Sequence, residues 1–285
     1  MLMNLETLNW MKDILTTLDI PENSLPKIKP SLYNFGTNSE LLKNVPLTSV
    51  LGDQQAALFG QNCINSGDVK NTYGTGCFAL TNTGNKIVHS NNGLLSTVAY
   101  QKDGEDPQYA LEGSVSIAGA AVQWLRDNLN IIQNSEDIET LAMSVKDNGD
   151  VYFVPAFSGL FSPHWDETAR GVLVGLSRFS NKSHIARAVL ESVAYQSNEL
   201  IQSMEKDIGT SFDTVNVDGG MVVNNLLMQF QSDIFDKKVT SQKINEITAL
   251  GAGASAYLFI NNLPLENMNS FISHSKSWNP NMDSK

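Results

Sequence analysis

The sequence predicts an α/β fold in which a mixed β-sheet is flanked by helices, and two patterns support this prediction. Between Val69 and Tyr109, short runs rich in Thr, Val, Tyr and Phe are separated by turn clusters at Asn82–Asn85 and Lys102–Pro107, as expected for consecutive strands. From about residue 150 onward, strand-like runs alternate with segments of helical periodicity. A β-rich start followed by this alternation is typical of α/β proteins, and 285 residues can bury a full core.

The first half of the chain contains three candidate helices besides the strands. An amphipathic helix is expected over residues 5–18, where apolar side chains recur every three or four positions. Three prolines then indicate a connector as far as about Val45. The run Gly52–Gln61 predicts a turn leading into a helix, with Asp53 at the N-cap position. A further helix is expected over Ser116–Ile131.

The second half begins with two predicted strands, a buried one at Val151–Pro155 and another at Gly171–Leu176. The clearest helix runs over Ser183–Asp207, with Gly209 well placed as the residue that ends it. The remaining elements are predicted in this order: a strand at Phe212–Val217, a helix through Phe235, a strand near Val239, and an Ala/Gly-rich helix at Ala249–Ile260.

Composition excludes several classes of partner. The net charge of −11 argues against DNA, RNA or an anionic membrane, because binding their phosphates needs a basic surface. A nucleotide can still bind such a protein through local backbone N–H groups and Mg²⁺. Only two cysteines are present, and neither a transmembrane run nor a signal peptide is apparent, so a cytoplasmic protein is expected.

Asp53 and the turn Gly74-Thr75-Gly76 form the most informative pair of features. Two glycines allow backbone N–H groups and a hydroxyl to approach a phosphate closely, and a carboxylate nearby could act as a base. Taken singly, each has a simpler interpretation: Asp53 could be only a helix cap, and the turn only a hairpin corner. Together they suggest phosphoryl transfer to a hydroxyl.

Two further pairs of residues could contact a nucleotide. Gly220 follows a predicted strand, where open α/β sheets bind ligands, and Asn224 lies four residues further on. An ordinary glycine turn explains this pair equally well. Gly119 and Gln123 share one helix face, and a glycine inside a helix indicates close approach, either by another helix or by a flat ligand such as adenine.

No metal site is predicted. His164 has no second His or Cys at ligand spacing and is interpreted as a loop histidine, whereas His184 is expected to be exposed in the first turn of its helix. Trp124 and Trp165 are interpreted as packing residues.

Several runs, in the same order along the chain, resemble the FGGY family of carbohydrate kinases and, within it, the glycerol kinases. The resemblance covers the chain from Met1 to about Ile260 and is carried by Gly52–Gln61, Lys70–Cys77, Tyr109–Gly113, Val154–Leu160, Gly171–Glu191, Val217–Gly220, Leu227–Asp233 and Thr248–Gly251. It implies the actin/Hsp70/hexokinase-like (ribonuclease H-like) ATPase fold, in which two α/β lobes close over ATP and substrate.

The resemblance also implies a reaction and roles for individual residues. The reaction is the phosphorylation of glycerol by MgATP to sn-glycerol 3-phosphate, with Asp53 as the base that accepts the hydroxyl proton. Gln54 would hydrogen-bond glycerol, and Phe78 would pack on its carbon atoms. Thr75 matches a contact to the ATP phosphates. The remaining matches to nucleotide contacts are Gly119, Gln123, Gly220 and Asn224.

The departures from the family pattern predict a partial catalytic unit. Residues 1–48 match the end of the family's N-terminal lobe and a connector, and residues 49–285 its nucleotide-binding domain, with a shortened tail at 262–285. The first lobe's phosphate motif and three glycerol-binding residues have no counterpart, so the chain alone is expected to be nearly inactive. Two alternatives remain: a kinase for another polyol or sugar, and a non-catalytic nucleotide-binding module. Full-length members of the family imply a homo-oligomer.

Overall fold

The computed structural model describes residues 2–37 and 43–282, and its centre is a seven-stranded mixed sheet. The strands lie in the order β3-β4-β2-β1-β7-β8-β9, and only the β1–β7 and β7–β8 pairs are parallel. Their bounds are β1 Val69–Tyr73, β2 Cys77–Gly84, β3 Leu95–Tyr100, β4 Gln108–Val115, β7 Thr214–Asp218, β8 Lys238–Gln242 and β9 His274–Trp278. The predicted mixed sheet is therefore confirmed.

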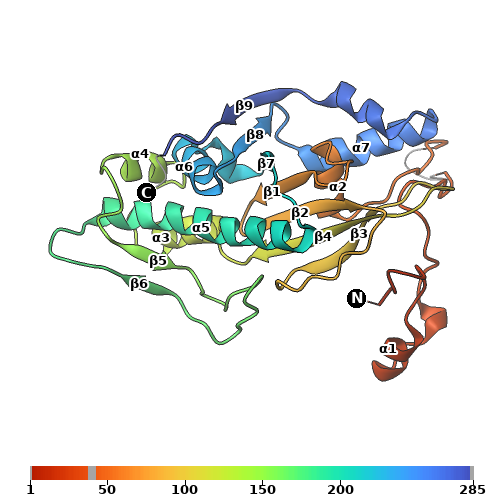
Figure 1. Cartoon of the computed structure of the whole chain (residues 1–285), viewed down its shortest axis with the longest axis horizontal. Coiled ribbons are helices and arrows are strands. Elements are labelled where there is room, and N and C mark those ends of the chain that lie inside the picture. The colour runs from red at the N-terminus through yellow and green to blue at the C-terminus, as the bar shows by residue number, and fades with distance from the viewer. Residues whose placement is uncertain (1, 38–42, 283–285) are drawn as a thin grey trace.

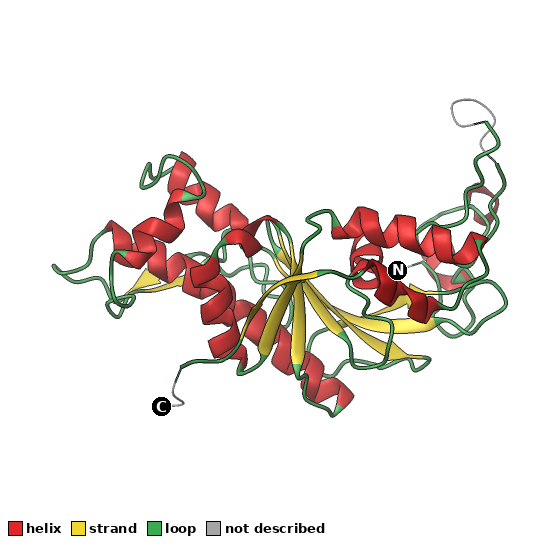
Figure 2. Ribbon diagram, turned by 90° about the horizontal axis from the view of Figure 1, so that it is seen from above, coloured by secondary structure: helices red, strands yellow, loops and turns green. Residues whose placement is uncertain are grey.

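Helices cover both faces of this sheet (Figures 1 and 2). On one face, α2 (Asp53–Gly60) and α7 (Ile247–Ile260) pack together over the β1–β4 half. On the other face, α5 (Lys182–Ile208) and α6 (Asn225–Phe235) cover the larger core, beside α3 (Gly119–Asp127) and α4 (Asp137–Met143). Within the described residues, no helix is both long and apolar enough to cross a membrane.

The long helix α5 forms where periodicity and both ends agree. Asn181 is the N-cap, and its side chain accepts the Ser183 N–H at 2.9 Å. Gly209 ends the helix with a left-handed backbone (φ 74°), a conformation that glycine adopts without strain. His184 completes the cap, because its Nδ1 accepts the Asn181 N–H at 3.2 Å, and its side chain is buried. The prediction that His184 is exposed was wrong.

Several predicted boundaries were too wide. Only Lys12–Thr17 (α1) is helical within residues 5–18, because Met3 and Trp10 form an antiparallel bridge that occupies the preceding backbone groups. Helix α3 begins at Gly119, so Gly119 is its first residue and not an internal one.

The strand expected to be buried at residues 151–155 is β5 (Tyr152–Val154), which pairs with β6 (Val172–Val174) in a separate two-stranded sheet. Only its central residue, Phe153, is buried. The sequence analysis missed α4, β9 and three short 3₁₀ segments, at Glu22–Ser24, Gly220–Val223 and Leu265–Phe271.

Candidate active site

One cavity of about 320 Å³ collects all five residues that the resemblance assigned to a nucleotide. It lies at the carboxyl ends of β1 and β7, the edge where open α/β sheets bind ligands. Apolar side chains from α3, α5 and the segment after β7 form much of its wall. The five residues are Thr75, Gly119, Gln123, Gly220 and Asn224.

The Gly74-Thr75-Gly76 turn between β1 and β2 is fixed to the start of α3. The Gly74 carbonyl accepts the Gly119 N–H at 3.0 Å, and the Thr75 carbonyl accepts the N–H groups of Ala118 (2.9 Å) and Ala120 (3.1 Å). Thr75 is exposed at the tip, and its hydroxyl has no hydrogen-bond partner among the described residues. That hydroxyl is available to a ligand.

Gly119 is small for a reason that the sequence did not indicate. A Cβ at this position would lie 2.6 Å from the Gly74 carbonyl oxygen, so the close approach is made by the turn and not by another helix. Gln123, one helical turn further along α3, is exposed and lines the same cavity. The two residues therefore share one face, as predicted.

The two glycines that follow β7 differ in what surrounds them. Gly219 has φ 97° and ψ 168°, a conformation open almost only to glycine, and a Cβ there would lie 2.4 Å from the Tyr73 carbonyl oxygen. A Cβ at Gly220 would meet no heavy atom within 4 Å. The fold therefore requires a glycine at position 219, whereas at position 220 the protein leaves room for a side chain or a ligand.

The position of Asn224 is compatible with both interpretations that the sequence left open. It is the N-cap of α6, where its Oδ1 accepts the Leu227 N–H at 2.9 Å, and it also lines the cavity. Glu139 of α4 accepts the next free N–H of α6, from Leu226, at 3.0 Å. Ile138 and Glu139 bring α4 into the cavity wall, together with Ser135 and Glu136 just before the helix. The sequence analysis missed this wall because a seven-residue helix has too few turns for a clear period.

Asp53 lies on the other face of the sheet, at the first turn of α2. Gly52 is the N-cap, so the prediction that Asp53 takes this position was wrong. The Asp53 side chain is exposed, and its Oδ1 accepts the Gln54 N–H at 2.8 Å. The carboxylate is therefore accessible to a bound molecule.

Gln54 and Phe78 are joined by a lysine that the sequence analysis did not single out. The Lys70 ammonium donates to the Gln54 side-chain carbonyl and, at 3.1 Å, to the main-chain carbonyl of Phe78. Asp53 and Glu112 lie close enough to influence this lysine electrostatically. A lysine within a strand gave no signal of burial.

A second cavity of about 520 Å³ continues from the first, with Gly220 and Val223 in the walls of both. Thr72 and Asp218 line it, and the Asp218 carboxylate accepts a hydrogen bond from the Gln61 amide at 2.9 Å. Thr72 also accepts a hydrogen bond from Lys70. The two cavities thus extend from Thr75 toward the surroundings of Lys70.

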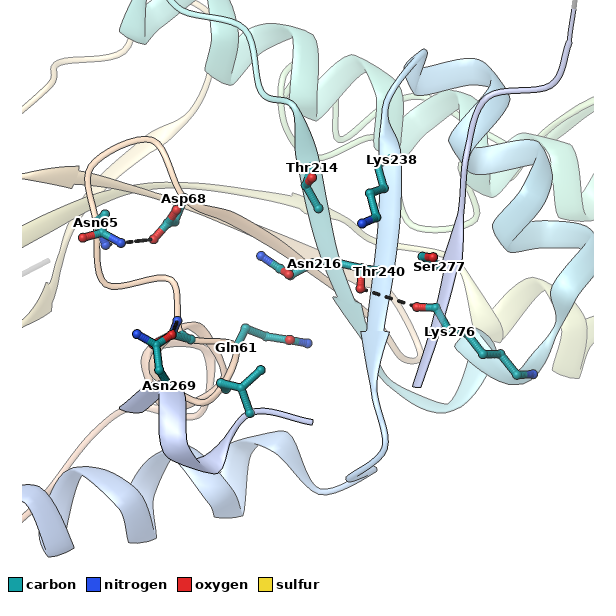
Figure 3. A pocket seen from close by; sticks show the side chains of 12 residues that line it. Gln61, Asn65, Asp68, Thr214, Asn216, Lys238, Thr240, Asn269, Lys276 and Ser277 are labelled. Carbon is teal, nitrogen blue, oxygen red and sulfur yellow. Dashed lines mark hydrogen bonds between the residues drawn. The ribbon is translucent and has the colours of Figure 1, made fainter. Parts of the chain in front are cut away.

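Figure 3 shows a different, polar cavity of about 480 Å³. It includes Thr214 and Lys238, the first residues of β7 and β8, so it lies at the opposite ends of these strands from Gly219. None of the predicted site residues lines it. Within the part of the chain that the structure describes, no group of three or more His, Cys, Asp or Glu side chains could hold a metal ion.

The remaining residues singled out from the sequence have local roles. His164 pairs with Glu199 at 3.1 Å, in an exposed position. Trp124 stacks on the buried Phe153, with ring centres 5.6 Å apart, which confirms packing. Trp165 is half exposed and donates from its indole to the Gly93 carbonyl at 2.7 Å.

Comparison with family models and curated proteins gives consistent matches. The FGGY family of carbohydrate kinases matches with its C-terminal domain over residues 69–257 and with its N-terminal domain over residues 1–60. Glycerol kinase of Brucella anthropi is 60% identical over 260 residues, which are 91% of this chain and 52% of that protein. Glycerol kinase of Methylobacterium radiotolerans is 52% identical over 283 residues, 99% of this chain and 56% of that protein. The chain spans about half the length of these curated relatives.

Solved structures give the same fold. The crystal structure of Plasmodium falciparum glycerol kinase with ADP superposes with a TM-score of 0.91 at 38% identity, covering 99% of this chain and 57% of that one. Xylulose kinase from Lactobacillus acidophilus superposes with a TM-score of 0.87 at 23% identity, covering 98% of this chain and 58% of that one. The actin/Hsp70/hexokinase-like fold class expected from the resemblance is confirmed.

Proposed function

Because this chain belongs to the FGGY family of carbohydrate kinases, we propose that it forms the nucleotide-binding half of an ATP-dependent glycerol kinase. The complete enzyme would convert glycerol and MgATP into sn-glycerol 3-phosphate and ADP. The observation that carries the proposal is the convergence of five nucleotide-contact candidates on one cavity, although they come from three separate segments of the chain. Relatives at 52–60% identity are glycerol kinases, which favours glycerol as the acceptor.

In this proposal the nucleotide occupies the cavity with its phosphates at Thr75. The free Thr75 hydroxyl and the exposed turn would contact phosphate oxygens. The open space beside Gly220 would admit the sugar and phosphates of the nucleotide. Gln123 and Asn224 would contact the base and sugar end. The apolar lining from Val122 and Leu190 suits an adenine ring.

Asp53 is proposed as the general base. Its exposed carboxylate can accept the proton of the glycerol hydroxyl as that oxygen attacks the γ-phosphorus and ADP leaves. Gln54 would donate a hydrogen bond to the polyol, and Phe78 would pack against its carbon atoms.

Mg²⁺ fits this arrangement as part of the nucleotide complex rather than as a resident ion. Mg²⁺ in such sites is held by one or two carboxylates together with phosphate oxygens and water, and Asp53 is an accessible carboxylate of this kind. When bound, the ion neutralises charge on the transferring phosphoryl group.

A separate lobe is expected to supply the opposite wall of the site. The N-terminal family match covers only residues 1–60, and we propose that residues 1–48 belong to that lobe and residues 49–285 to the nucleotide-binding domain, with a short tail at 262–285. This chain alone should therefore bind nucleotide but turn over glycerol slowly or not at all.

The test is a reconstitution. ADP release with glycerol and MgATP is measured for this chain alone and for this chain fused behind the segment of Brucella anthropi glycerol kinase that it does not cover. The fusion should be active, and Asp53→Asn should lower its kcat by roughly 10²–10⁴-fold. Asp106→Asn, which changes an exposed loop carboxylate, is the matched control and should leave activity unchanged. An active Asp53→Asn fusion would contradict the role of Asp53.

The same assay separates the alternatives. A kinase for another substrate would prefer xylulose or gluconate over glycerol. A non-catalytic module would bind nucleotide yet remain inactive in the fusion, and Asp53→Asn would leave its cellular role intact.

We also propose that the enzyme is a cytoplasmic homo-oligomer. The outer face of the β5–β6 sheet carries the cross-strand pairs Tyr152–Val174 and Val154–Val172, each side chain between 42% and 48% exposed. A second copy of the chain could bury this apolar face despite the net charge of −11. Val172→Asp should then shift the mass measured by light scattering to that of a monomer. The cytoplasm contains the MgATP that the proposed reaction needs.

A further inference from the structure

Lys70 is buried at the point where α2, β1 and β2 meet. Its side chain has no measurable exposure. The ammonium donates to three neutral oxygens: the Gln54 side-chain carbonyl, the Thr72 hydroxyl at 2.9 Å and the Phe78 main-chain carbonyl at 3.1 Å. An ammonium group has three N–H donors, so its hydrogen bonding is complete.

No carboxylate forms an ion pair with this ammonium within residues 2–37 and 43–282. Five ionisable groups face it from a distance: the carboxylates of Asp53 in α2, Glu112 in β4 and Asp218 in β7, and the thiols of Cys63 after α2 and Cys77 in β2. Burial lowers the pKa of Lys70 to about 8, against the opposing influence of these groups. A buried charge without a contacting counter-ion is costly, so the position calls for a function beyond packing.

We propose that Lys70 is a positioning residue that fixes the orientation of the Gln54 side-chain amide and thereby selects a hydroxyl oxygen of the substrate. This inference rests on the proposed kinase function. Because the Gln54 carbonyl is held by the ammonium, the amide NH₂ is the group left to face a bound polyol. The NH₂ group can only donate, so the substrate atom it contacts must accept.

The contact to Phe78 extends the same argument. One ammonium holds both the Gln54 side chain and the main chain of Phe78, so the two residues proposed to flank the polyol are tied to one point. Without this tie, the amide could rotate by 180° and present its carbonyl to the substrate instead. The enzyme would then lose its discrimination between a hydroxyl, which can accept, and an ammonium, which cannot.

The decisive measurement compares glycerol with its amino analogues, 2-amino-1,3-propanediol and 3-amino-1,2-propanediol, in the active fusion. In Lys70→Met, KM for glycerol should rise by about tenfold or more, because an orienting hydrogen bond from a charged group is lost, with a smaller change in kcat. The preference for glycerol over at least one analogue, as a ratio of kcat/KM, should fall by a similar factor. A purely structural lysine would lower activity toward all three substrates alike.

A pH profile gives a second readout in the parent fusion. Above about pH 8 the ammonium loses a proton, and two N–H donors then remain for three acceptors. KM for glycerol should rise across this range in the parent and stay level in Lys70→Met. Burial raises the pKa of the Cys63 thiol and that of the Cys77 thiol, so neither accounts for a change in KM near pH 8.

Lys238→Met is the matched control. Lys238 is also a lysine in a strand of the main sheet, but it is exposed and lies in the polar cavity of Figure 3. It should keep the parent KM, substrate preference and pH profile. Unchanged KM and preference in Lys70→Met would overturn the proposal.

Side-chain amide NMR of this chain without its fusion partner tests the orientation without any assay of activity. In the ¹⁵N-glutamine spectrum, the Gln54 NH₂ resonances should shift in Lys70→Met but not in Lys238→Met. If Lys70→Met does not fold, Lys70→Arg replaces it in the kinetic and NMR measurements. Arginine keeps the positive charge but changes the geometry of its hydrogen-bond donors. If every fusion is inactive but the Gln54 resonances shift, the kinase function is refuted and the Lys70–Gln54 contact stands. If the resonances do not shift, the contact itself is refuted.

Discussion

Replacing each of the two adjacent glycines after β7 by alanine should separate folding from binding. At Gly219, alanine must adopt φ 97° and ψ 168°, and its Cβ must approach the Tyr73 carbonyl oxygen to 2.4 Å. The backbone strain costs about 1–3 kcal/mol and the overlap another 1–3 kcal/mol, so the free energy of unfolding should fall by about 2–6 kcal/mol. At Gly220 the new methyl group meets no protein atom within 4 Å, and the change should stay within about 0.5 kcal/mol.

Urea unfolding, followed by tryptophan fluorescence, measures the free energy of unfolding of both variants. Calorimetric titration with ADP measures their affinity for the nucleotide. Gly220→Ala should weaken ADP binding by about tenfold or more, equivalent to about 1.4 kcal/mol, because its methyl group projects into space proposed for the nucleotide. Equal stability of the two variants would refute the argument from backbone geometry. Unchanged ADP affinity in Gly220→Ala would refute the proposed location of the nucleotide.

Three further predictions concern stability. Asn181→Ala removes the N-cap of α5 and should lower the free energy of unfolding by about 1 kcal/mol in thermal denaturation, whereas an unchanged melting temperature would argue against the cap. Tyr73→Phe removes the hydroxyl that donates to the Gln231 Oε1 at 2.8 Å, and leaving that buried oxygen unpaired should cost about 1–3 kcal/mol in urea unfolding. Although burial alone would raise the pKa of Glu205, hydrogen bonds from Lys237 and neighbouring groups lower it below 4.5. The carboxylate therefore stabilises the fold above pH 4.5. The difference in free energy of unfolding between the parent and Glu205→Gln should be largest at pH 7 and should shrink as the pH falls below 4.5. A difference that does not change with pH would contradict this.

The sequence predicted elements best where several local signals coincide. Helix α5 has a strong period, a capping Asn181 and a terminal Gly209, and its bounds differ by one residue from the prediction. Residues 5–11 have the same kind of period. The antiparallel bridge between Met3 and Trp10, however, competes with a helix for the backbone groups there. Strand β9 was missed because it is a polar edge strand whose partner, β8, is distant in sequence.

The candidate site shows the same division. The resemblance supplied the residues that line the cavity proposed for the nucleotide, whereas local reasoning left Gly220 and Asn224 undecided between a turn and a ligand contact. Lys70 could not be found from the sequence, because its importance depends on three acceptors that α2, β1 and β2 bring together only on folding. The reason for Gly119 also required the folded structure, since the atom it must accommodate belongs to Gly74.

The hydrogen bonds between the Gly74-Thr75-Gly76 turn and the first residues of α3 have a mechanical consequence. Because Thr75 and Gln123 lie at two ends of this bonded unit, the span between the proposed phosphate and base contacts is set by the unit itself and not by independent loops. In the proposed complex, the turn and α3 would thus fix the distance between the two nucleotide contacts. A substitution on the buried side of α3, at Leu125 for example, would tilt the helix. It would thereby misplace both proposed contacts, although the substituted side chain does not touch the ligand.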